Sequence, residues 1–136
     1  MILVFGGAYQ GKLDYVLDKF QLSEDDVYRC SRDGEINLDC RVIYGLEEFV
    51  YWCTENGWEA KAVLESRFDM DADVPYLDTP AGTGKIFIAN DVSQGLVPMD
   101  ATDRAFREMM GRTLLHLAKE AEEVHRVFCG LGQRLK

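Results

Sequence analysis

A glycine-rich stretch with a lysine near the amino terminus has the composition of a phosphate-binding loop. Residues 6–12 fit the pattern G-x-x-x-x-G-K, and Leu13 follows. In such a loop the glycines let backbone N–H groups turn toward an anion, the next helix presents its positive end, and the lysine reaches the β- and γ-phosphates. We therefore expect a nucleotide to be bound by Gly6, Gly7, Ala8, Tyr9, Gln10, Gly11, Lys12 and Leu13, with Lys12 as a catalytic candidate.

Leu13 is the departure from this pattern, because the motif ends in Ser or Thr, whose hydroxyl holds Mg²⁺. Without that hydroxyl, the metal has to be held by waters and another carboxylate, so whether the chain is an enzyme stays open. A second interpretation is that the glycines only allow a strand and a helix to pack tightly. The position of the motif, between an apolar strand and an amphipathic helix, favours phosphate binding.

Asp91 is a candidate for holding or orienting the metal. It follows shortly after the apolar segment 86–89. In P-loop proteins, an acidic residue at the end of a second apolar strand reaches the metal opposite the phosphate loop. The alternative is that residues 90–91 form an Asx turn where the chain leaves a strand.

Arg104 and Arg107 are candidates for a phosphate clamp. They lie three residues apart on one face of a predicted helix, and each guanidinium can bind a phosphate with two N–H groups. The alternative is an ordinary surface ion pair between Arg104 and Glu108, four residues later.

Apolar patterns predict the elements that position these residues. A continuous apolar run indicates a buried strand at 1–5, further strands are expected at 27–30, 85–89 and 124–129, and helical spacing indicates helices at 13–20, 46–55, 58–67 and 101–121. Asp100 is the expected N-cap of the last helix. Asp33-Gly34 suggests a hairpin between 27–30 and 35–43, and the segment 68–84 is expected to be a surface loop.

Strands that alternate with helices predict a mostly parallel sheet with helices on both faces. We expect one α/β domain over residues 1–136, with the three-layer architecture of P-loop NTPases and an antiparallel strand formed by 133–136. Such sheets bind ligands beyond the carboxyl ends of their strands. The site should therefore follow Phe5 and Ala89.

The charge of the chain limits its partners. It carries 24 acidic and 15 basic residues, a net charge of −9, which argues against nucleic acid or an anionic membrane as a partner. The apolar run at the amino terminus is too short for a signal sequence, and the four cysteines form no C-x-x-C pair. We expect a soluble cytoplasmic protein with free thiols.

The carboxyl-terminal half resembles a known enzyme family. Residues 90–98 read N-D-V-S-Q-G-L-V-P, and the resemblance continues at 103–108, 111–112, 121–124 and 130–136. These segments are similar, in the same order, to those of the bifunctional adenosylcobinamide kinases and adenosylcobinamide-phosphate guanylyltransferases. The resemblance covers 84–136 well and 1–12 fairly.

The resemblance implies a P-loop fold that assembles as a trimer and uses ATP or GTP with Mg²⁺. The family phosphorylates the aminopropanol hydroxyl of adenosylcobinamide and then transfers GMP to that phosphate through a guanylylated histidine. By this resemblance residues 6–12 hold the nucleotide phosphates, Asp91 replaces a glutamate of the family, and Arg104 and Arg107 fall on its arginine pair.

The chain also departs from this family. It has no histidine before His116, so guanylyl transfer is not expected, and the segment 41–45 lacks the acid that ends the family's central strand. Glu47 and Glu48 follow within a helix and are expected to face solvent. The sequence therefore predicts a nucleotide-binding, cobinamide kinase-like protein of cobalamin synthesis or salvage. The alternative is a non-catalytic nucleotide- or corrinoid-binding subunit with a regulatory or structural role.

Overall fold

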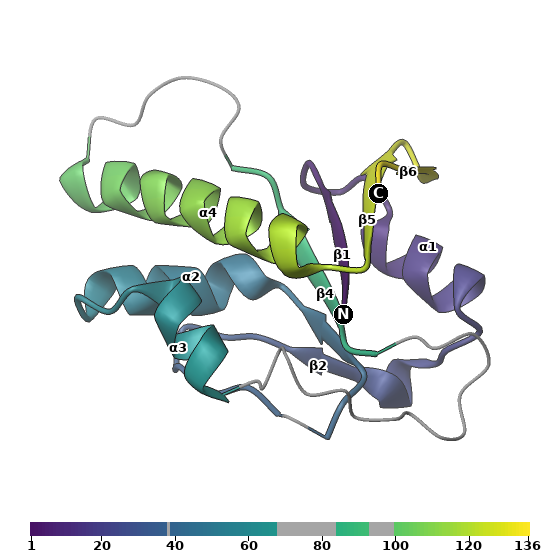
Figure 1. Cartoon of the computed structure of the whole chain (residues 1–136), viewed down its shortest axis with the longest axis horizontal. Coiled ribbons are helices and arrows are strands. Elements are labelled where there is room, and N and C mark those ends of the chain that lie inside the picture. Colours follow the sequence, from purple (N-terminus) through teal and green to yellow (C-terminus); the bar gives the residue numbers. More distant parts are fainter. Residues whose placement is uncertain (38, 68–83, 93–99) are drawn as a thin grey trace.

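The computed structural model describes residues 1–37, 39–67, 84–92 and 100–136 (Figure 1). The strands are β1 (Ile2–Gly6), β2 (Val27–Arg29), β3 (Val42–Tyr44), β4 (Ile86–Asn90), β5 (Glu123–Phe128) and β6 (Leu131–Arg134). The helices are α1 (Lys12–Lys19), the 3₁₀ turn η1 (Glu24–Asp26), α2 (Leu46–Glu55), α3 (Ala60–Arg67) and α4 (Ala101–Glu120).

The strands form one sheet in the order β2-β3-β4-β1-β5-β6. All neighbouring pairs are parallel except β5 and β6, which are antiparallel. Figure 1 shows α1 on one face of the sheet and α2, α3 and α4 on the other. The predicted fold class is therefore confirmed, including the antiparallel strand at the carboxyl end.

Two apolar layers cover the two faces of this sheet. Because successive side chains of a strand point to opposite faces, Ile2 and Val4 pack with Val16 of α1, whereas Leu3 packs on the opposite side with residues of α2, α3 and α4. A strand buried on both faces has to be apolar throughout, which explains the continuous run at the amino terminus.

The predicted hairpin around Asp33-Gly34 is wrong. β2 and β3 run parallel, with Val27 opposite Val42 and Arg29 opposite Tyr44. Gly34 turns the chain with a φ of +74°, and a Cβ there would lie 2.6 Å from ring atoms of Trp52. The two residues therefore make a turn that packs on α2, within the connection between two parallel strands.

The long helix begins as the sequence predicts. The Asp100 carboxylate accepts hydrogen bonds from the backbone N–H groups of Thr102 and Asp103, which makes it the N-cap of α4. The expected surface loop at 68–84 lies almost entirely outside the described residues. Within the described ranges, none of the helices is long and apolar enough to cross a membrane.

A buried polar chain connects α1 to β5. His125 is 1% exposed; its Nδ1 lies 3.0 Å from the Tyr15 hydroxyl and its Nε2 lies 2.9 Å from the Glu123 carboxylate. A carboxylate can only accept, so Nε2 of His125 donates to Glu123, and Nδ1 shares the second hydrogen bond with the Tyr15 hydroxyl. Tyr15 lies one turn after Lys12, so this chain fixes the helix that carries the lysine.

Replacing Glu123 with glutamine should destabilise the protein at neutral pH. The hydrogen bond from His125 holds the pKa of the Glu123 carboxyl below its ordinary value. This stabilisation is present above the pKa of the unfolded chain and disappears as the pH falls through the lower value of the folded chain. We expect Glu123→Gln to reduce the free energy of unfolding by about 1–2 kcal/mol at pH 7. Urea unfolding should show this difference closing in acid, whereas the neighbouring exposed control Glu122→Gln should have little effect at either pH.

Candidate functional site

The predicted phosphate loop connects β1 to α1. β1 ends at Gly6 and α1 begins at Lys12, with Gly11 as its N-cap in the left-handed conformation at a φ of 80°. Tyr9 also has a positive φ, 58°, and its side chain is fully exposed. The glycine before the lysine is thus required for the backbone to enter the helix.

The turn between β5 and β6 holds this loop in shape. The backbone N–H of Gly130 donates to the Gln10 carbonyl at 2.8 Å, and the N–H of Cys129 donates to Gln10 Oε1 at 2.7 Å. The backbone and the side chain of Gln10 are therefore both held by a segment about 120 positions later in the chain. No local pattern in the sequence indicates this contact.

Lys12 points into the protein rather than into bulk water. It is 4% exposed, and its Nζ donates to the Gly7 carbonyl within the loop at 2.6 Å. Burial lowers the pKa of its ammonium group, and the negative charge of Glu47 acts in the opposite direction. A buried ammonium whose hydrogen bond is made to the loop itself is placed to exchange that carbonyl for a phosphate oxygen.

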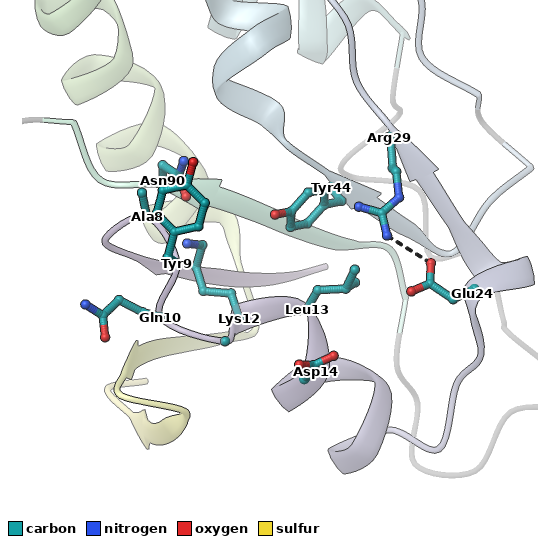
Figure 2. A pocket seen from close by; sticks show the side chains of 11 residues that line it. Ala8, Tyr9, Gln10, Lys12, Leu13, Asp14, Glu24, Arg29, Tyr44 and Asn90 are labelled. Carbon is teal, nitrogen blue, oxygen red and sulfur yellow. Dashed lines mark hydrogen bonds and ion pairs between the residues drawn. The ribbon is translucent and has the colours of Figure 1, made fainter.

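A pocket of about 440 Å³ opens at the loop, at the carboxyl ends of β1, β2, β3 and β4 (Figure 2). This is the edge of the sheet at which the sequence predicts a site. Ala8 to Leu13 all contribute to the wall, whereas Gly6 and Gly7 form the base of the loop. The lining residues are Ala8, Tyr9, Gln10, Gly11, Lys12, Leu13, Asp14, Glu24, Arg29, Tyr44 and Asn90.

The wall opposite the loop carries a cation that the sequence does not reveal. Arg29, at the end of β2, pairs with Glu24 at 3.0 Å and lies 5.1 Å from the ring centroid of Tyr44 at the end of β3. In Figure 2 these side chains stand across the pocket from Lys12 and Asn90. Arg29 and Tyr44 reach the site because parallel strands bring their carboxyl ends to one edge of the sheet. In the sequence, the only feature that could have indicated them is their position at the ends of strands.

Glu47 does not face solvent as predicted. It lies in the first turn of α2, half-buried, and its carboxylate accepts a hydrogen bond of 3.0 Å from the backbone N–H of Asn90. Burial raises the pKa of Glu47, while the Asn90 bond and the Lys12 charge lower it. Glu48, the next residue, is instead paired with Arg32 at the surface. The spacing alone could not distinguish the two glutamates, because both belong to one helical turn.

Comparison with known proteins agrees with the resemblance. The model of a family described as cobinamide kinase / cobinamide phosphate guanyltransferase matches residues 51–135, more than half of the chain. The chain belongs to this family. The bifunctional adenosylcobalamin biosynthesis protein CobU of Salmonella typhimurium is 37% identical over 51 residues, which are 38% of this chain and 28% of that protein. The matched region thus spans about a quarter of its relative, and the family match begins after the loop of residues 6–13.

Three predicted site residues lie inside the segment that matches the cobinamide kinase family. Asp91 directly follows β4, and its backbone N–H donates to the Gly6 carbonyl at 2.8 Å, next to the base of the loop. Arg104 and Arg107 lie in the first two turns of α4, whose amino-terminal end points away from the sheet in Figure 1. The structure therefore places Asp91 beside the loop, and it does not bring the two arginines among the residues that line this pocket.

Both histidines of the chain lie away from the pocket. His125 is enclosed between Tyr15 and Glu123, and His116 of α4 lies with Nε2 3.0 Å from the carboxylate of Glu65 on α3. Neither is among the lining residues. Each of them lies against a glutamate and not against a serine or cysteine.

Proposed function

We propose that this chain binds ATP or GTP at the loop of residues 6–13 and transfers the terminal phosphoryl group to the hydroxyl of a cobinamide-type corrinoid. The buried ammonium of Lys12, a residue that lines a pocket at four strand ends, is the observation that carries this proposal. Membership of the cobinamide kinase family supports the choice of acceptor.

The residues of the chain would act by positioning and by electrostatics. Lys12 would release the Gly7 carbonyl and bind the β- and γ-phosphates at the positive end of α1. Arg29 would approach the transferred group from the opposite wall. The bond between the γ-phosphorus and its bridging oxygen breaks, a bond to the acceptor oxygen forms, and the hydroxyl proton passes to solvent.

The oxygen donors beside the loop fit Mg²⁺, the metal that the family implies. Mg²⁺ keeps several of its waters and needs only one or two carboxylates besides the phosphates. The Glu47 carboxylate lies against the backbone N–H of Asn90, and Asp91 is held to Gly6 through its backbone, although the described residues contain no cluster of three or more ligands. When bound, Mg²⁺ would neutralise charge that develops on the phosphates.

Guanylyl transfer is not part of the proposal. A covalent nucleotide intermediate on histidine needs an accessible imidazole nitrogen close to the α-phosphate. The sequence holds two histidines; one is buried with both nitrogens occupied, and neither lines the pocket.

A second candidate function is a nucleotide- or corrinoid-binding subunit without catalysis. It is favoured by Leu13, which lines the pocket at the position where the motif has a hydroxyl. The two candidates differ in turnover alone, so binding measurements do not separate them.

Two measurements test the proposed function. Calorimetric titration with ATP and with GTP, each with Mg²⁺ or with EDTA, should show binding in the wild type that is strongly weakened in Lys12→Met. Incubation with cobinamide, the bound nucleotide and Mg²⁺ should yield a phosphorylated corrinoid by mass spectrometry. Nucleotide binding without product would favour the non-catalytic subunit, and the absence of nucleotide binding would contradict the kinase and the nucleotide-binding form of that subunit.

Restoring the hydroxyl with Leu13→Thr should strengthen binding of the magnesium nucleotide about fivefold, the effect of one additional hydrogen-bond-strength contact. Affinity in EDTA should change little, because the hydroxyl acts on the metal. Leu17→Thr, one turn further along α1, introduces the same side chain away from the pocket. An equal gain in both variants, or no gain in Leu13→Thr, would contradict the proposed role of this position.

A further inference from the structure

Glu47 is one of the two carboxylates named beside the loop, and its position gives it a specific role toward the metal. In the sheet, β4 lies between β1 and β3, so the end of β4 adjoins both the phosphate loop and the start of α2. From the first turn of α2, the Glu47 carboxylate reaches the end of β4 and accepts a hydrogen bond from the backbone N–H of Asn90. Asn90 lines the pocket. Glu47 itself is not among the residues that line the pocket.

Glu47 and Lys12 act on each other electrostatically, and each charge favours the ionised form of the other. They are nevertheless not in direct contact. In the described structure the Lys12 ammonium is hydrogen-bonded to the Gly7 carbonyl, and the Glu47 carboxylate to the Asn90 N–H. The two opposite charges flank the phosphate site without neutralising each other through an ion pair.

A carboxylate fixed beside a polyphosphate site opposes nucleotide binding unless a cation comes with the nucleotide. Two of the usual holders of that cation are absent here, because Leu13 has no hydroxyl and β3 ends at Tyr44, followed by Gly45, without an acid. Glu47 is the carboxylate that the fold places next to Lys12 in their stead. Asp91 is held in the neighbourhood through its backbone, by the hydrogen bond to Gly6.

We propose that Glu47 couples nucleotide binding to Mg²⁺: its carboxylate holds the hydrated ion against the phosphates, replacing the hydroxyl that Leu13 lacks. The inference rests on the proposed function, since it requires a nucleotide in the loop. Glu47 acts through water bound to the metal and is a positioning residue. It makes the site one for a nucleotide with magnesium rather than for a free nucleotide or inorganic phosphate.

The test compares two glutamates that are adjacent in one helical turn. ATP is titrated into wild type, Glu47→Gln and Glu48→Gln, each with excess Mg²⁺ and with EDTA. Wild type and Glu48→Gln should bind more tightly with Mg²⁺, and in Glu47→Gln this ratio of affinities should fall about tenfold, as is usual when an outer-shell partner of a metal is removed. In EDTA, the affinity of Glu47→Gln for ATP should be equal to or higher than that of the wild type, because the variant lacks the negative charge that repels the phosphates. A purely structural role for Glu47 would weaken both titrations equally.

Three other outcomes would overturn the inference. The first is an unchanged ratio in Glu47→Gln, and the second is an equal loss in Glu48→Gln. The third is loss of the ratio in Asp91→Asn alone, which would assign the metal to Asp91. Wild type that binds ATP without any effect of Mg²⁺ contradicts the role of Glu47 only, whereas wild type that binds no nucleotide contradicts the proposed function as well. Should Glu47→Gln fail to fold, Glu47→Asp keeps the charge on a shorter side chain and should show a reduced ratio.

Discussion

Lys12→Met should lower nucleotide affinity about 10- to 100-fold and leave the protein folded. The ammonium group makes charge-assisted hydrogen bonds to the phosphates, each of which contributes about 1.5–3 kcal/mol. Methionine preserves the length and burial of the side chain but has no charge. Because burial lowers the pKa of Lys12, the site disfavours the ammonium form, and its removal should leave thermal stability unchanged or slightly higher.

Lys19→Met is the matched control, since Lys19 lies at the other end of the same helix, exposed, with its ammonium 6.0 Å from the Tyr15 ring centroid. Calorimetry should detect a large loss in Lys12→Met and almost none in Lys19→Met. Equal affinities of the two variants would mean that the loop is not a phosphate site. Thermal unfolding of both variants shows whether any loss reflects misfolding.

Gly6→Ala should strongly destabilise the fold. A Cβ added at Gly6 would lie 2.3 Å from the backbone carbonyl oxygen of Val127, on the neighbouring strand β5. Neither strand can retreat, because both are buried in the sheet. Overpacking of this kind costs about 3 kcal/mol, which corresponds to a drop in Tm of roughly 10 °C for a domain of this size. Differential scanning calorimetry measures this difference directly.

Gly7→Ala provides the comparison within the same motif. A Cβ at Gly7 would lie 3.5 Å from Gln10 Cγ, an ordinary van der Waals distance, so stability should change by less than about 0.5 kcal/mol. The pair of variants separates two reasons for a glycine. If Gly6→Ala were as stable as Gly7→Ala, the close approach of β1 and β5 would not be what requires Gly6.

The glycines of the loop meet different structural demands. Gly6 meets the demand for tight packing, since it lies against the backbone of β5. Gly11 meets the demand for a left-handed residue at the start of α1, and it too lies close to a neighbour, since a Cβ there would be 3.3 Å from Gly130 Cα. Packing therefore explains the first glycine, and the positioning of Lys12 explains the second.

The sequence by itself determined the local structure of this protein. Apolar runs located β1, β4 and β5, the spacing of apolar residues located the helices, and Asp100 marked the start of α4. The phosphate motif located the residues of the loop, and similar segments in the carboxyl-terminal half indicated the family. These features depend on residues a few positions apart, so local patterns are enough to predict them.

Only the tertiary structure decided which side chains share the site. The placement of β4 between β1 and β3 brought Glu47 to Asn90 and Lys12, and the parallel pairing of β2 and β3 brought Arg29 to Tyr44. The Asp33-Gly34 turn signalled a change of direction without specifying which strands pair. Contacts of this kind depend on the order of strands in the sheet, which is set by packing between distant segments and leaves no periodic trace in the sequence.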